Sequence, residues 1–161
     1  MMKMQMKGKY TMVEYVVASR DDMELLMQSR LEMLKVVNQL PCDYEFSKEL
    51  INNSREYFNS DNQTTVLAVD RGVIGCAAIC YIEMMPTFSH PTGKRAHLMN
   101  VYTKSEYCRK GIALHMLNIL ISEAKEKGVT EISLDATELG KSLYKKCNFV
   151  ESEDCMVLNL K

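Results

Sequence analysis

Residues 108–113, with the sequence CRKGIA, have the types and spacing of an anion-binding turn. They follow an apolar stretch typical of a strand, residues 95–103, and lead into an amphipathic helix expected over 109–127. The first turn of a helix carries backbone N–H groups without intrahelical acceptors, together with the positive end of the helix dipole. A strand that enters a helix through a small-residue turn therefore predicts a site for phosphate.

Four residues support this site. Gly111 has no Cβ, so the backbone can approach an anion closely, and Ala113 keeps the next turn of the helix low. Arg109 and Lys110 add positive charge at the same place. The alternative is that Gly111 only eases a tight turn and that the basic pair is solvated.

Composition limits the classes of function. A chain of 161 residues that is 47% hydrophobic is expected to form one domain, residues 1–161, around its own core. The formal net charge of -1 gives no electrostatic reason to expect nucleic acid or an anionic membrane as a partner, so an anion site must be local. The six cysteines are expected to be reduced thiols, and Cys76 and Cys80 lack further metal ligands at a familiar spacing, so no metal is expected.

The chain contains neither an apolar stretch of signal-peptide length nor about 18 consecutive apolar residues, which predicts a cytoplasmic protein. Hydrophobic periodicity and turn residues predict the order strand, helix, helix, three strands, helix, strand, helix, strand. Ser19 with Asp22 and Ser47 are the expected caps of the first two helices. The other expected boundaries are strands at 10–17, 64–69, 73–84, 95–103, 130–136 and 150–160, and helices at 109–127 and 138–146.

Two stretches, SEYCRKGIALHML and ELGKSLYKKCNF, together with this order, resemble the GNAT superfamily of acyl-CoA-dependent N-acetyltransferases. The family signature is Arg or Gln, two residues, Gly, one residue, then Gly or Ala, and it falls here on residues 108–113. LYKKCNF resembles the downstream LYxKxGF of the family. The resemblance covers about residues 63–150 and implies an α+β fold of three layers, α/β/α. Its mixed sheet would be antiparallel in the N-terminal half and would end in a splayed parallel pair.

The resemblance also implies acetyl-CoA as co-substrate, with its pyrophosphate at the glycine motif. Its pantetheine arm would lie between residues 99–103 and 133–136. Cys108 stands where Arg or Gln is usual, which predicts weaker binding of coenzyme A, and Thr137 stands where Asn is frequent. The implied cofactor-binding residues are Asn100, Val101, Tyr102, Cys108, Arg109, Lys110, Gly111, Ile112, Ala113, Thr137 and Tyr144.

For catalysis, the resemblance points to Tyr144 as the proton donor to the leaving thiolate, because a phenol stays protonated at neutral pH. The alternative for Tyr144 is a packing role on a short helix. Glu83, near the end of its strand, is the predicted base that accepts the proton of the amine, with His97 and Asp135 as alternatives. The amide of Val101 or Tyr102 is the expected donor to the oxyanion.

The predicted function is N-acetyl transfer from acetyl-CoA to a primary amine, directly and within a ternary complex. The alternative is a non-catalytic module of the same fold that senses acyl-CoA or binds a protein. A nucleotide-binding module is disfavoured because no Gly-Lys-Ser/Thr follows the glycine. The amine is expected to belong to a small molecule or a protein, and edge strands such as the last one are compatible with a homodimer.

Overall fold

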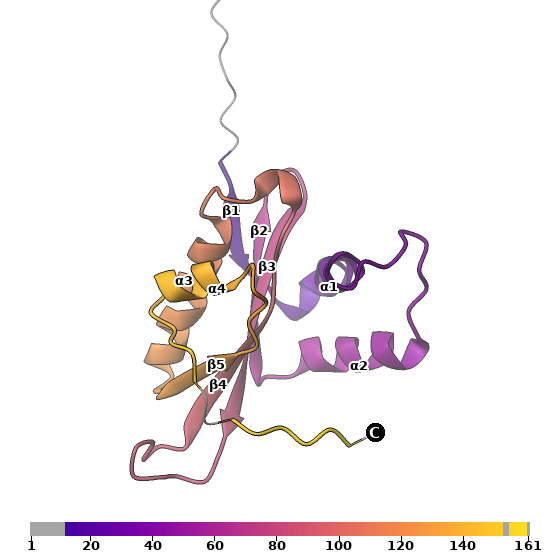
Figure 1. The fold of residues 1–161 in the computed structure, drawn as a ribbon. Helices are drawn as coiled ribbons and strands as arrows, with labels where there is room; N and C mark the ends of the chain where they lie inside the picture. Colours follow the sequence, from indigo (N-terminus) through magenta and orange to yellow (C-terminus); the bar gives the residue numbers. More distant parts are fainter. Residues whose placement is uncertain (1–11, 153–154, 161) are drawn as a thin grey trace, which may run out of the picture.

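A computed structural model describes residues 12–152 and 155–160, and its sheet lies between two layers of helices (Figure 1). The five strands are adjacent in chain order, with β1 to β4 antiparallel and β5 parallel to β4. This arrangement confirms the α+β class and the mixed sheet. The strands are β1 (Glu14–Val17), β2 (Gln63–Val69), β3 (Val73–Glu83), β4 (Lys94–Thr103) and β5 (Glu131–Leu134), and the helices are α1 (Met23–Val37), α2 (Lys48–Asn59), α3 (Ile112–Glu126) and α4 (Lys141–Lys146).

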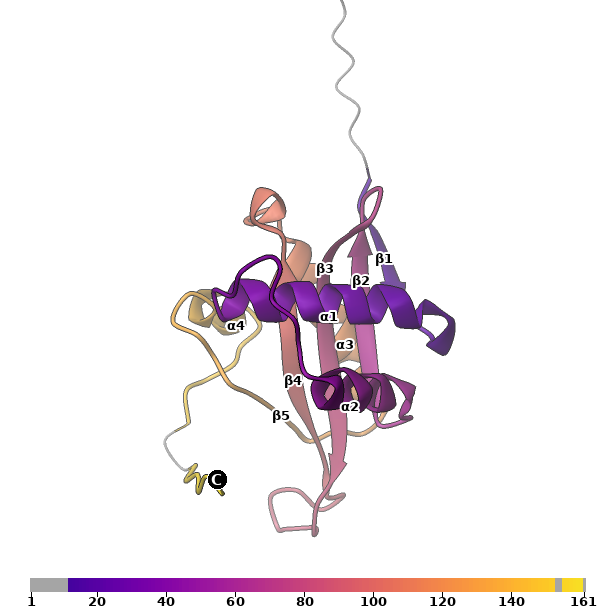
Figure 2. The same ribbon diagram turned by 90° about the vertical axis from the view of Figure 1, so that its right-hand side faces the viewer.

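Helices α1 and α2 cover one face of the sheet, where Figure 2 shows α1 crossing in front of the strands and α2 below it. The predicted caps are confirmed. Ser19 and Asp22 form a capping box at the 3₁₀ turn before α1, and the Ser47 hydroxyl accepts a hydrogen bond from the backbone N–H of Leu50. Leu26 of α1 and Phe58 of α2 are buried together against β2 and β3.

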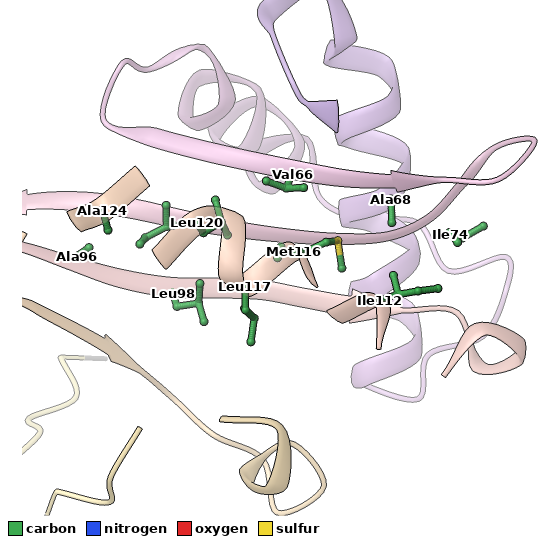
Figure 3. Packing of buried hydrophobic residues seen from close by; sticks show 12 residues of the cluster. Val66, Ala68, Ile74, Ala96, Leu98, Ile112, Met116, Leu117, Leu120 and Ala124 are labelled. Atoms are coloured by element: carbon green, nitrogen blue, oxygen red, sulfur yellow. The ribbon is translucent and has the colours of Figure 1, made fainter. Parts of the chain in front are cut away.

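The opposite face carries the larger core, which Figure 3 shows from close by. The apolar residues of α3 recur every three or four positions, so they share one side of the helix, which packs on the sheet. Met116, Leu117 and Leu120 are fully buried there. Burial of a side chain of this size stabilises a fold by roughly 1.5–3 kcal/mol. This packing therefore fixes the position of the N-terminus of α3 relative to β4.

The C-terminal segment corrects one prediction. The expected strand over 150–160 does not form in residues 150–152 and 155–160, which have no regular secondary structure. Apolar composition favours a strand only where a partner edge is present. The edge strand next to which it would have to pair, β5, is only four residues long. Met156 and Leu160 are 98% and 88% exposed, so the segment does not pack on the sheet.

Within the described residues, no helix has the length and apolar character needed to cross a membrane. Helix α3 begins at Ile112 rather than at the expected 109, because Arg109 and Gly111 have positive φ angles of 60° and 79°. Helix α4 begins at Lys141 rather than at 138. There the backbone oxygen and hydroxyl of Thr137 both accept from the N–H of Gly140, which forms a turn before the helix.

Candidate active site

The parallel pair of strands separates partway along its length. Pairing between β4 and β5 runs from Arg95 opposite Glu131 to Leu98 opposite Leu134, and then stops. From Met99 to Thr103, β4 keeps only its antiparallel partner β3. Its other edge can therefore hydrogen-bond an extended, amide-containing ligand.

A β-bulge at Asn100 marks the point of separation. Ala78 lies opposite Met99 and Cys76 lies opposite Tyr102, so β4 uses one more residue than β3 over this interval. Asn100 has a φ of 56°, in the left-handed region. Its side-chain oxygen accepts a hydrogen bond from Arg30 Nη1 at 3.0 Å, and its carbonyl oxygen lies 3.3 Å from Cys76 Sγ.

The bulge changes which face of the sheet the side chains of β4 reach. Before the bulge, the side chain of Leu98 packs on the α3 side of the sheet. After the bulge, Val101 packs on the α3 side and Tyr102 packs on the α1 side. Strict alternation would have placed Tyr102 on the α3 side. Because the bulge interrupts alternation, the consecutive residues Met99 and Asn100 both line the cavity below α1 and α2.

We expect Asn100→Ala to lower the free energy of unfolding by about 2–3 kcal/mol. A left-handed alanine costs roughly 1–2 kcal/mol, and the lost hydrogen bond from Arg30 costs about 1 kcal/mol more. Asn100→Gly is the matched control, since it loses the same side chain but adopts a positive φ freely. Urea denaturation measures both variants. Equal destabilisation by alanine and glycine would contradict strain at this residue.

Unpaired backbone donors collect where β4 leads into α3. Across the part of the chain that the structure describes, no N–H from residue 109 to residue 114 donates to a protein acceptor. A Cβ built on Gly111 meets nothing within 4 Å, so the space beside this glycine, in the middle of the cluster, is open. The unpaired N–H groups that the sequence predicted are therefore present, and six such donors at one turn can bind an anion, whereas a diphosphate at this place stays a prediction.

The side chains around this cluster are mostly exposed. Lys110 Nζ lies 4.9 Å from the ring centroid of Tyr107, whose hydroxyl donates to Asp70 at 3.0 Å. Cys108 Sγ lies 3.6 Å from the carbonyl oxygen of Thr103 and 3.5 Å from that of Lys104. The Cys108 thiol thus contacts the loop carbonyls, while the adjoining amides stay open.

Tyr144 lies on α4, whose first turn Thr137 initiates. Its ring packs edge-on against Phe149, with centroids 6.0 Å apart, and the side chain is half-buried beside the α3 core. Burial raises the pKa of Tyr144 above its ordinary value, so the phenol keeps its proton at neutral pH. The Tyr144 hydroxyl makes no hydrogen bond to another described residue.

The predicted base Glu83 lies away from the bulge. Glu83 is exposed at the end of β3, opposite Lys94. It lies five residues beyond Ala78, the residue of β3 beside the bulge, which at ~3.4 Å per residue places the two residues about 17 Å apart along the strand. Its role as base stays a prediction. His97 lies nearer, two residues before Met99 and on the same face of β4, with Nδ1 2.8 Å from Ser133 Oγ and Nε2 3.7 Å from Asp135.

A cavity of about 590 Å³ lies between α1, α2 and strands β3 and β4. On the side of the cavity nearest the sheet, the charged residue is Arg30 of α1, which was not identified from the sequence. The signal was available, because Arg30 follows the core residues Leu26 and Met27 by four and three positions, on the same side of α1. The cavity is lined by Arg30, Ser47, Glu49, Leu50, Asn53, Ser54, Tyr57, Phe58, Ala78, Met99 and Asn100.

Many solved structures are similar to this chain, including the following three. A predicted acetyltransferase from Clostridium acetobutylicum, solved with acetyl-CoA, is 30% identical with a TM-score of 0.80, over 92% of this chain and 96% of that one. A GCN5-related N-acetyltransferase from Ralstonia eutropha is 19% identical with a TM-score of 0.76, over 92% and 99%. Glucosamine-6-phosphate N-acetyltransferase from Arabidopsis thaliana is 14% identical with a TM-score of 0.67, over 93% and 99%. The last two show the fold alone.

Comparison with curated protein sequences gives no significant match. The model of the acetyltransferase (GNAT) family matches residues 31–149, well over half of the chain, and includes the glycine motif, the bulge and Tyr144. The family match and the similarity to the C. acetobutylicum structure both concern acetyltransferases, and both cover most of the chain. The chain therefore belongs to the GNAT family of acetyltransferases.

Proposed function

We propose that the protein transfers an acetyl group from acetyl-CoA to a primary amine held in the cavity below α1 and α2, by direct attack in a ternary complex. The observation that carries this proposal is the cluster of open N–H groups at residues 109–114, next to the unpaired edge of β4. The similar chain from C. acetobutylicum was solved with acetyl-CoA, which supports the same co-substrate here.

The residues that would hold acetyl-CoA are those of the motif and the bulge. The backbone N–H groups from Arg109 to Leu114, including those of Gly111, Ile112 and Ala113, would donate to the diphosphate, and the side chains of Arg109 and Lys110 would add charge. The N–H of Cys108 already donates to the carbonyl oxygen of Ser105, so Cys108 would border the diphosphate without donating its N–H. The β4 edge at Asn100, Val101 and Tyr102 would pair with the amides of the pantetheine arm. Thr137 and Tyr144 would border that arm, and the bound molecule supplies an activated thioester.

Three groups of the chain would then act on the reaction. His97, supported by Ser133 and Asp135, is the nearer candidate to accept the proton of the amine, with Glu83 as the other. A backbone N–H of Val101 or Tyr102 would stabilise the negative charge that develops on the carbonyl oxygen. The hydroxyl of Tyr144 would protonate the departing sulfur.

The test is a panel of amines incubated with acetyl-CoA. We expect coenzyme A to raise the melting temperature and at least one amine to give an acetylated product in equal amount to the thiol released. Because Cys42, Cys108 and Cys155 are exposed and would react with thiol reagents, the product should also be detected by mass spectrometry. Thermal stabilisation without turnover of any amine would favour the acyl-CoA-sensing alternative.

A further inference from the structure

The guanidinium of Arg30 is half-buried in the cavity and has no acidic partner among the described residues. Its hydrogen bond goes to the neutral side chain of Asn100. The more exposed Arg20 and Arg55, in contrast, form ion pairs with Asp61 and Glu24, both at 2.8 Å. Burial lowers the pKa of Arg30, and no carboxylate opposes this effect.

Leaving a cation partly desolvated and unpaired destabilises a fold, because water is removed from the charge without compensation by an anion. Such a residue inside a cavity indicates a ligand that supplies the missing negative charge. Arginine suits a carboxylate especially well, since its planar donors can make two parallel hydrogen bonds to the two oxygens.

The surroundings of Arg30 fit a small amphipathic molecule. Leu50, Phe58 and Met99 provide apolar walls in the same cavity, and Glu49 lies at its exposed rim. The hydroxyl of Tyr57 is buried in this cavity wall without a hydrogen-bond partner among the described residues. The cavity volume of about 590 Å³ lies in the range of small-molecule sites.

We propose that the acceptor is an amino acid, or a similarly small amine with a carboxylate, and that Arg30 binds this carboxylate. This inference rests on the proposed acetyl transfer. Arg30 Nη1 lies 3.0 Å from the side chain of Asn100, and Asn100 directly precedes Val101, a proposed donor to the oxyanion. A carboxylate bound to Arg30 would therefore lie close to the proposed reacting centre. The amine of the same molecule can reach that centre only if few bonds separate it from the carboxylate, as in an amino acid.

The test compares amines with and without the carboxylate, such as phenylalanine with phenethylamine and leucine with isoamylamine. For the wild type we expect kcat/KM to be about 10- to 100-fold higher for the better amino acid than for its decarboxylated partner, the range of a charge-assisted pair. Arg30→Gln should remove this preference and Arg30→Lys should keep part of it. Arg55→Gln is the matched control, an arginine on α2 paired with Glu24, and should keep the preference in full.

A second readout does not depend on turnover. Calorimetric titration of the twenty amino acids into the protein saturated with coenzyme A should show binding to the wild type and at least tenfold weaker binding to Arg30→Gln. Absence of binding by every amino acid, or equal loss of kcat/KM for both members of each pair in Arg30→Gln, would overturn the inference. The second result would mean that Arg30 only supports the bulge.

The two proposals can fail separately. If coenzyme A does not stabilise the wild type and no amine is acetylated, the proposed acetyl transfer fails. If coenzyme A stabilises the protein and amines without a carboxylate are acetylated as well as amino acids are, the assignment to Arg30 alone fails.

Discussion

Gly111→Glu is expected to lower the affinity for coenzyme A by at least about 100-fold. A side chain at φ 79° costs roughly 1–2 kcal/mol of folding free energy, and the glutamate would enter the open space beside Gly111, next to the N–H groups of residues 109–114. There it would occupy the place of the diphosphate and repel its charge. A loss of about 2.8 kcal/mol corresponds to 100-fold in affinity, which blocked space and charge repulsion together supply. The backbone strain is present with and without coenzyme A and therefore lowers the stability of the fold instead. Calorimetric titration with coenzyme A gives the measurement.

Two further variants separate the causes of this loss. Gly111→Gln has nearly the shape of the glutamate without its charge, and should bind coenzyme A more tightly than Gly111→Glu. Gly111→Asn tolerates a positive φ, and should retain most of the affinity. Since a Cβ at Gly111 contacts nothing in the protein, all three variants should fold. Wild-type affinity in Gly111→Glu would place the diphosphate elsewhere.

Tyr144→Phe is expected to lower kcat about 100-fold or more and to leave the affinity for coenzyme A within about twofold of the wild type. General acid catalysis contributes roughly 10²–10⁴ in rate, and the phenylalanine ring keeps the packing against Phe149. Steady-state kinetics with an amine found in the panel measures the first quantity, and calorimetric titration measures the second.

Tyr81→Phe is the matched control, because it removes the hydroxyl of another tyrosine on the α3 side of the sheet, one that is buried without a hydrogen-bond partner in the described chain. It should retain full activity. The raised pKa of Tyr144 adds a second check. Its proton is lost only above the ordinary value of about 10, so the wild-type rate should not fall on the alkaline side below about pH 10. Normal turnover by Tyr144→Phe would exclude it as the acid.

Elements that depend on local signals could be predicted from the sequence. The spacing of apolar residues predicted α3, because one side of that helix is buried along its whole length. Ser47 marked the start of α2 because the cap is a contact within one turn. The glycine motif predicted an open amide cluster for the same reason, since both the turn and the helix end lie within six residues.

Features that depend on distant contacts could not be predicted. The bulge at Asn100 depends on register with β3 and on Arg30, which is 70 residues away. The strand expected over 150–160 could form only beside a free strand edge, and the composition of the segment does not show whether such an edge is available. The position of Glu83 relative to the bulge likewise follows from strand register, whereas sequence order only placed it near the end of its strand.

The two halves of the site come from separate stretches of the chain. The cavity walls proposed to select the acceptor lie mostly within residues 30–58, on α1 and α2, whereas the open amides proposed to bind the co-substrate lie within residues 109–114. Substitutions in the first stretch can therefore alter acceptor choice and leave the thioester donor in place. If these proposals hold, the segment that contains α1 and α2 is the one to graft or randomise when a new acceptor is wanted, with Arg30 as the position to vary first.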